Sequence, residues 1–144
     1  MKKNIYVLVI IAVLAYGYIN QQQVTEPGIS SPQASSSAVQ QAYDRQQSDV
    51  QVQGEGIVIR VLPDDVEGSR HQRFILEVSQ GNSLLIAHNI DLADRVTGIR
   101  KGDKISFYGE YEWNPKGGVL HWTHHDPAGR HPDGWLKHDG RTYQ

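Results

Sequence analysis

Residues 71–88 have the sequence HQRFILEVSQGNSLLIAH, in which two alternating apolar runs flank a short polar segment. In residues 73–78 every second position is apolar, at Phe74, Leu76 and Val78, which is the pattern of a strand with one face on a core. The segment Gln80-Gly81-Asn82 has the composition of a tight turn, and residues 83–88 resume the apolar run. This stretch therefore predicts an antiparallel hairpin. The core-facing positions of its first strand are Phe74, Leu76 and Val78.

Three more segments predict further strands by the same alternation. A long first strand is expected over residues 53–62, and Gly54 and Gly56 near its start would let it bend between two halves of a barrel. The fourth strand is expected over residues 104–113 and the fifth over residues 119–125. The apolar faces of these strands are, in order, Ile57, Ile59 and Val61; Ile105, Phe107 and Tyr111; and Leu120 with a buried Trp122.

The order of these elements predicts the fold class. Residues 89–95 begin with a capping side chain and predict a short helix, or else a turn, between the third and fourth strands. Three strands, a helix and two strands are the order of an oligonucleotide/oligosaccharide-binding (OB) barrel, a five-stranded Greek-key barrel. We therefore predict an all-β, OB-like barrel over residues 52–144. A small sandwich and an SH3-like barrel are the alternatives.

The N-terminal residues predict export from the cytoplasm. Lys2 and Lys3 precede an apolar run over residues 5–19, which is typical of a signal peptide or a signal anchor at residues 1–19. Cleavage and anchoring both stay open, because the run falls slightly short of the roughly 20 residues that span a bilayer. The chain is expected in a bacterial cell envelope on the periplasmic side, secreted or anchored, with the inner membrane as a partner if the segment is uncleaved.

Two segments connect this N-terminus to the barrel. Residues 20–36 consist mostly of Gln, Ser and Pro and predict a flexible linker. Residues 37–51 predict a short helix. Its apolar face would contain Ala38, Val39, Ala42 and Tyr43.

Composition limits the chemistry that the chain can perform. It has no cysteine, which excludes disulfides, thiolate metal sites and a thiol nucleophile. The net charge of −2 gives no basic footprint and disfavours nucleic acid as a partner. Any metal would have to be held by imidazole and carboxylate groups, which are densest in residues 121–135.

The OB topology predicts where such groups meet. The start of the second strand and the ends of the third and fifth strands should share one rim of the barrel. Candidate ligand-binding residues at this rim are Arg70, His71, His88, Asn89, Asp91 and Arg130. Candidate metal ligands are His71, His88, His124, His125, Asp126 and His131. Glu110 and Glu112 are expected at the opposite end of the barrel.

The rim has three interpretations. Imidazoles and carboxylates could bind a divalent metal such as zinc, with an open position for water. They could equally hydrogen-bond one another and hold a loop-rich end of the barrel together. A histidine paired with Asp91 or Asp126 could also act in metal-free acid–base chemistry. No established motif assigns a catalytic residue, so whether the chain is an enzyme stays open.

Several blocks of the sequence resemble a known family. They are Gly68 to Phe74, His88 to Asp91, Gly109 to Asn114, His121 to Pro127 and His131 to Trp135. Together they are similar to the bacterial family catalogued as domain of unknown function 3465, over roughly residues 52–144. The resemblance implies a small exported or membrane-anchored protein and brings no activity, ligand or catalytic residue with it.

Two functional hypotheses follow. The first is a cell-envelope binding module that recognises a small ligand, a saccharide or a protein through the rim. The alternative is a metal-dependent hydrolase, similar to a phosphodiesterase or nuclease, that uses the same rim.

Overall fold

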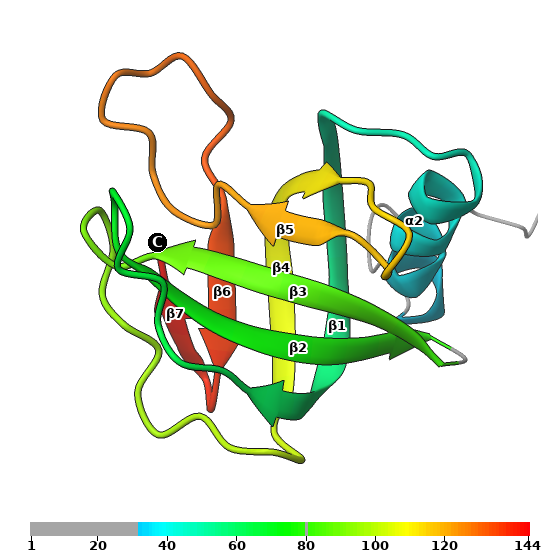
Figure 1. The fold of residues 1–144 in the computed structure, drawn as a ribbon, viewed down its shortest axis with the longest axis horizontal. Helices are drawn as coiled ribbons and strands as arrows, with labels where there is room; N and C mark the ends of the chain where they lie inside the picture. The colour runs from blue at the N-terminus through cyan, green and yellow to red at the C-terminus, as the bar shows by residue number, and fades with distance from the viewer. Residues whose placement is uncertain (1–31, 80) are drawn as a thin grey trace, which may run out of the picture.

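The computed structural model describes residues 32–79 and 81–144, with side chains from residue 38 onward. The predicted export segment and residues 20–31 of the predicted linker lie outside the described residues. Figure 1 shows a helix beside a strongly curved sheet that closes on itself. Within the part of the chain that the structure describes, no helix is long and apolar enough to cross a membrane.

The strands form a closed barrel with two more strands added to it. In chain order the elements are α2 (Pro32–Asp44), β1 (Val50–Val61), β2 (His71–Ser79), β3 (Asn82–Asn89), β4 (Lys104–Glu112), β5 (Val119–His121), β6 (Trp135–His138) and β7 (Arg141–Tyr143). The sheet order is β1-β2-β3-β5-β4-β6-β7, and β1 also pairs with β4 and closes the barrel. Among the strand pairs that the structure describes, β3 with β5 is the parallel one, and the others are antiparallel. This is the OB order, so the predicted five-stranded barrel is confirmed.

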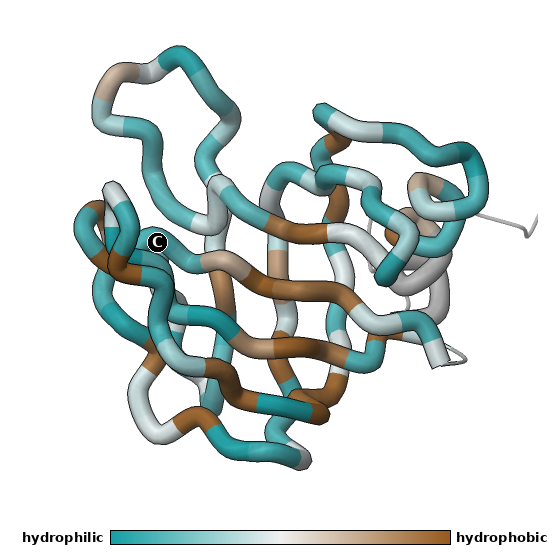
Figure 2. Tube along the Cα trace, in the orientation of Figure 1, coloured by the Kyte–Doolittle hydropathy of each residue, from teal (hydrophilic) through white to brown (hydrophobic). Residues whose placement is uncertain are grey.

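The core fills the inside of this barrel. Phe74 and Leu76 on β2 and Ile105 and Phe107 on β4 are fully buried, as their alternation predicts. Figure 2 shows apolar segments along the strands and polar residues over most of the loops. The pairing of β2 with β3 includes Phe74 opposite Ile86, which confirms the predicted hairpin.

The core face of β1 differs from the expectation. Ile57 and Val61 are 43% and 45% exposed, whereas Val52 and Val58 are buried. Gly54 and Gly56 occupy the core face between these valines, and a Cβ at Gly56 would lie 2.7 Å from the carbonyl oxygen of Glu77. Apolar side chains occur on both faces of this strand and glycine has none, so hydrophobic alternation indicated the wrong face. The predicted role of β1 as a shared strand is confirmed, because it pairs with both β2 and β4.

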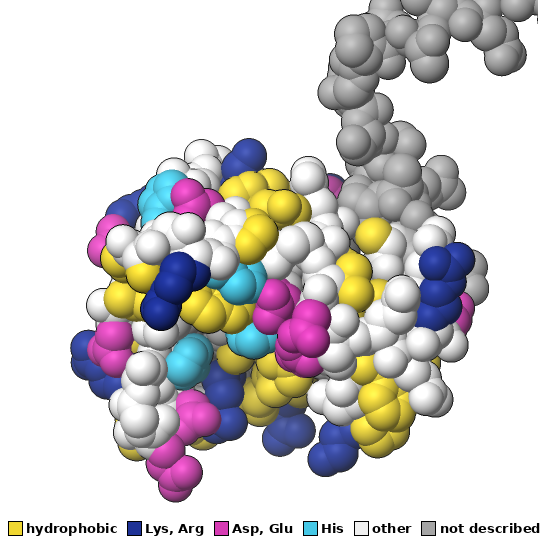
Figure 3. All heavy atoms as spheres, turned by 90° about the horizontal axis from the view of Figure 1, so that it is seen from above, with side chains coloured by type: hydrophobic (Ala, Val, Ile, Leu, Met, Phe, Trp, Pro, Cys, Tyr) yellow, Lys and Arg dark blue, Asp and Glu magenta, His cyan; other side chains and the backbone are white. Residues whose placement is uncertain are grey.

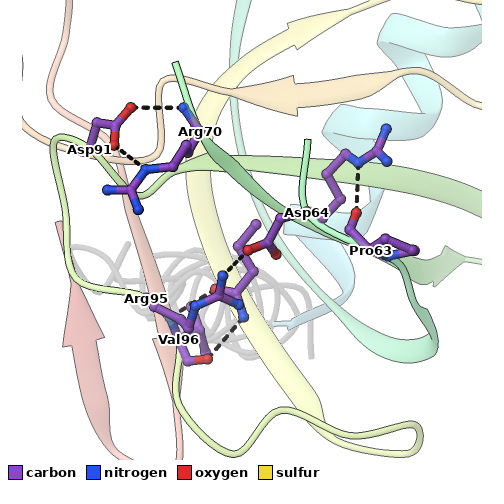
Figure 4. Close-up of polar contacts among 8 residues, drawn as sticks. Pro63, Asp64, Arg70, Asp91, Arg95 and Val96 are labelled. Atoms are coloured by element: carbon purple, nitrogen blue, oxygen red, sulfur yellow. Dashed lines mark hydrogen bonds and ion pairs between the residues drawn. The ribbon is translucent and has the colours of Figure 1, made fainter. Parts of the chain in front are cut away.

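The segment between β3 and β4 contains no helix in residues 90–103, all of which the structure describes. The Asn89 side chain accepts a hydrogen bond from the Asp91 amide at 2.9 Å, which closes a turn. Val96 is then drawn into the core, where the Gln72 side chain bonds its amide at 2.9 Å and its carbonyl at 3.0 Å. These two bonds occupy the amide and the carbonyl of Val96 (labelled in Figure 4), which are backbone groups that a helix would need. The predicted short helix is therefore wrong for this described segment, and the alternative, a turn, is what the structure shows.

The fifth strand is shorter than predicted, because it ends at His121. Trp122 has a φ of 53°, a left-handed conformation that a strand cannot contain. The chain turns there, so Trp122 is half-buried at the surface instead of lying in the core beside Leu120. Thr123, with no exposed surface, takes the inward position instead.

A helix and a hairpin pack on the closed barrel. Helix α2 packs on β1 and β2 with Val39 and Ala42 buried, as its predicted apolar face requires. It begins at Pro32, so residues 32–36 are helical rather than linker. The C-terminal residues form the hairpin β6–β7, in which Leu136 is fully buried.

Candidate functional site

The predicted rim brings Arg70 and Asp91 together. The Arg70 side chain lies 2.7 Å from Oδ1 of Asp91, and the Arg70 amide donates to Oδ2 at 2.8 Å (Figure 4). These hydrogen bonds, the backbone one first, hold the pKa of Asp91 below its usual range. A second ion pair joins Arg95 to Asp64 beside it. Arg70 is thus engaged in holding the loop between β1 and β2 against the loop after β3.

A pocket of about 220 Å³ opens beside this ion pair. It lies over the outward faces of β2, β3 and β5 and over the loops that follow β3 and β5. Its lining residues are Ser69, His71, Ala87, Asn89, Leu92, His121, Trp122 and His124. None of them is Lys, Arg, Asp or Glu, so the pocket offers hydrogen-bonding groups and apolar surface without a fixed charge.

Backbone carbonyls orient two of the pocket imidazoles. His71 donates from Nδ1 to the carbonyl of Ser69 at 2.8 Å, and His124 donates from Nδ1 to the carbonyl of His125 at 2.6 Å. Because a carbonyl only accepts, Nδ1 carries the proton in both rings. In both rings Nδ1 is thus occupied, and Nε2 is the nitrogen left for another partner.

His88 has a different environment from its neighbours on β3. It is fully buried, with Nε2 donating to the carbonyl of Asp94 at 3.0 Å and Nδ1 accepting from the Thr123 hydroxyl at 2.8 Å. Burial lowers the pKa of His88 to about 4, so the ring is neutral at physiological pH. With both nitrogens occupied, His88 links the loop after β3 to the segment after β5 and has no free atom for a ligand.

Two aspartates organise the loop over residues 122–134, which rises from the barrel in Figure 1. Asp126 accepts hydrogen bonds from the amides of Ala128, Arg130 and His131 at 2.9, 2.7 and 2.9 Å. These bonds, those from Ala128 and Arg130 first, lower the pKa of Asp126.

Asp133 closes the same loop from its other end. It accepts from the Asp126 amide at 2.8 Å and pairs with Nδ1 of the exposed His125 at 2.9 Å. The Arg130 side chain is exposed. His125, Asp126 and Arg130 thus belong to the loop's own structure and do not line the pocket.

The same loop carries His131 back onto β4. The His131 ring stacks on Trp122 with centroids 4.1 Å apart, and its Nε2 contacts Oε2 of Glu110. Burial alone would lower the pKa of His131, but hydrogen bonds to Pro132 and Glu110 outweigh it and raise this pKa. Glu110 was predicted at the end of the barrel opposite His131, but the two side chains are in contact, so this prediction is wrong. The turn at Trp122 shortens β5 and folds the loop back over β4.

Glu110, Glu112 and His121 form a cluster next to the pocket. Glu110 and His121 are directly paired between β4 and β5, and Glu112 lies two residues further along the same face. Nε2 of His121 lies 3.4 Å from Oε1 of Glu110 and 3.6 Å from Oε1 of Glu112. In Figure 3, histidines and carboxylates lie next to one another on this face. Among the described residues, this is the group whose geometry suits a metal ion.

The structure separates the six predicted metal ligands. His71 and His124 line the pocket, His88 is buried, His125 and Asp126 lie in the loop, and His131 contacts Glu110. Of the predicted ligand-binding residues, His71 and Asn89 line the pocket and Arg70 with Asp91 borders it.

Sequence reasoning missed the role of His121, Glu110 and Glu112. One signal was available, because a hairpin around residues 114–118 places the outward side chains of residues 110 and 121 opposite each other.

Comparison with known proteins places the chain in a family. A family model described as "Protein of unknown function (DUF3465)" matches residues 25–144. The chain belongs to this family. Among curated proteins, none matches the chain. The match of the DUF3465 model begins before the segment in which the resemblance was noted and includes helix α2.

Proposed function

We propose that this DUF3465 protein is a small binding module of the cell envelope whose pocket takes a saccharide unit. The observation that carries the proposal is the pocket lined by His71, Asn89 and His124 on the outer face of β2 and β3. In OB barrels this face and the loop between the first two strands bind oligosaccharides and oligonucleotides.

The chemistry of the lining favours a neutral polar ligand. Its amide, hydroxyl and imidazole groups can exchange hydrogen bonds with sugar hydroxyls, and Trp122 and Leu92 add apolar surface. The volume of about 220 Å³ lies below the roughly 300–1,000 Å³ of pockets for drug-sized ligands, which suits a ligand of one ring. The net charge of −2 weighs against a nucleic acid.

A variant that fills the pocket tests the proposal. Ala87 lines the pocket, and Ala87→Phe would occupy this space without removing a side-chain hydrogen bond. We expect a panel of monosaccharides and amino sugars to perturb backbone NMR signals around Ala87 and Asn89 in the wild type, and the variant to lose this response.

Leu85→Phe is the matched control. It changes the same strand face two residues away, outside the lining of this pocket. It should bind as the wild type does. Perturbations that are absent from the wild type, or that persist in Ala87→Phe, would contradict the proposal.

The proposed location in the cell envelope is supported by the N-terminal sequence. Lys2 and Lys3 followed by the apolar run over residues 5–19 support export. A full chain fused at its C-terminus to alkaline phosphatase should be active in a bacterial host, and the same fusion without residues 1–19 should be inactive. Equal activity of both fusions would remove this part of the proposal. The mass of the mature chain then distinguishes a cleaved signal from an anchor in the inner membrane.

A metal-dependent hydrolase is the second candidate, favoured by the position of Glu110, Glu112 and His121 beside the pocket. Glu110, Glu112 and His121 would hold the metal, which would supply an activated water for hydrolysis of a phosphodiester to a phosphomonoester and an alcohol. We expect the zinc- or manganese-loaded protein to hydrolyse bis(p-nitrophenyl) phosphate. The Glu112→Gln variant should lose this activity. Equal rates with and without protein exclude this candidate.

A further inference from the structure

The cluster formed by Glu110, Glu112 and His121 contains a polar atom that none of the described residues satisfies. Nε2 of His121 has essentially no solvent-accessible surface and no hydrogen-bond partner within residues 32–79 and 81–144. Its nearest acceptors, the two glutamate Oε1 atoms, lie at 3.4 and 3.6 Å, without the geometry of a hydrogen bond. A buried polar nitrogen of this kind requires a partner, and an ion between it and the carboxylates would supply one.

The separations between these atoms suit a tetrahedral metal ion. Ligand atoms bound to Zn²⁺ at about 2.0–2.1 Å lie about 3.3 Å from one another at the corners of a tetrahedron. The two distances from Nε2 of His121, 3.4 and 3.6 Å, are close to this edge. One ligand atom from each of the three residues can be chosen so that all three lie within 4.8 Å of one another.

The charges around the cluster also favour a cation. Among the ion pairs that the structure describes, Glu110 and Glu112 face only imidazoles. His131 contacts the second oxygen of Glu110, which leaves Oε1 directed at His121. Such an outer hydrogen bond is the usual way in which proteins orient a metal-binding side chain. Glu110 is also mostly buried, at 15% exposure, so water screens its charge poorly.

We propose that Glu110, Glu112 and His121 bind one divalent first-row metal ion, and that Zn²⁺ fits best. One imidazole and two carboxylates are ligands that zinc accepts, and three protein ligands leave one position for water. The site does not depend on which ligand the neighbouring pocket takes. Because His121 also lines that pocket, a bound metal would fix one of its walls.

Calorimetry on the full chain without a histidine tag, stripped of metal by a chelator, tests this assignment. Titration with zinc chloride should show one tight equivalent, and bound zinc should raise the melting temperature. Glu112→Gln keeps the size of the side chain and removes its charge. We expect it to weaken zinc binding by at least about tenfold, the loss that even outer-shell changes produce.

The matched control is His125→Ala. It removes another histidine–carboxylate pair, His125 with Asp133, which lies outside the cluster. Circular dichroism should show that both variants are folded, and His125→Ala should bind zinc as the wild type does. The proposal is overturned if the wild type binds no stoichiometric zinc, if Glu112→Gln binds it equally well, or if His125→Ala loses the tight equivalent.

Discussion

Trp122 determines the direction of the chain after β5, and with it the position of residues 123–134. Its φ of 53° ends β5 after three residues, and its ring stacks on His131 and makes a tilted contact with the ring of His124. A left-handed backbone is costly for a bulky residue, so its surroundings must hold it there. The close approach of Gly134 contributes, because a Cβ at Gly134 would lie 1.9 Å from the carbonyl oxygen of Trp122. One residue thus places His131 against Glu110.

His88 should make stability depend on pH. Its pKa falls from 6.5 to about 4 in the folded protein, so between these values the unfolded chain binds more protons. Stability is then complete above pH 6.5 and decreases as the pH falls toward 4, by roughly 3 kcal/mol in total. Urea unfolding at a series of pH values measures this loss.

His88→Gln is the control for this titration. Glutamine can donate to the Asp94 carbonyl and accept from the Thr123 hydroxyl, but it does not titrate. The variant should therefore lose less stability than the wild type over the same pH range. Parallel curves for the two proteins would mean that His88 is not the group responsible.

The loop over residues 122–134 is an element that holds itself together by side-chain-to-backbone hydrogen bonds. Asp126 and Asp133 accept from four amides in all, namely those of Ala128, Arg130, His131 and Asp126. These bonds replace the ladder that a continued strand would have made. The loop's shape, and with it the position of His131, therefore depends on two carboxylates, the half-buried Asp126 and the exposed Asp133.

Replacing Asp126 should loosen this loop and leave the barrel intact. In Asp126→Ala, the amides of Ala128, Arg130 and His131 lose their acceptor, so their hydrogen exchange should become faster. Amides of β2 and β4, which lie in the barrel, should exchange as before. Asp126→Asn keeps one acceptor oxygen and should give an intermediate result. Unchanged exchange in the loop of Asp126→Ala would show that other contacts hold it.

At the scale of the whole molecule, the C-terminal hairpin adds buried side chains to the core of the closed barrel. β6 pairs with β4 outside the five-stranded ring and brings Leu136, with no exposed surface, into the core. Tyr143 on β7 is also buried, and its hydroxyl lies 3.1 Å from the Thr97 hydroxyl. His138 bonds Asp103 at 2.9 Å and ties the hairpin to the loop before β4.

Deletion of residues 135–144 should therefore unfold the domain or destabilise it strongly. Each large apolar side chain that is fully buried contributes about 1.5–3 kcal/mol, and typical domains have only about 5–15 kcal/mol in total. Circular dichroism during thermal unfolding measures the effect. Removal of the exposed Gln144 alone should leave the melting temperature unchanged. A cooperative transition at the wild-type temperature in the truncated chain would show that the hairpin is dispensable.

Local alternation was enough to predict the barrel. The period of two in β2 and β4 places Phe74, Leu76, Ile105 and Phe107 in the core because a strand directs successive side chains to opposite faces. The order of the strands then predicted the OB topology and the meeting of Arg70 with Asp91. Alternation failed in β1, where the core face consists partly of Gly54 and Gly56.

The candidate site was decided by tertiary contacts. His88 and His71 look alike in sequence, but one is buried between Thr123 and Asp94 and the other lines the pocket. The cluster of Glu110, Glu112 and His121 depends on strand pairing, and the contact of His131 with Glu110 depends on the turn at Trp122 and the amides held by Asp126. A local pattern determines which side a side chain faces. Its neighbours come from distant parts of the chain, and only the folded packing brings them together.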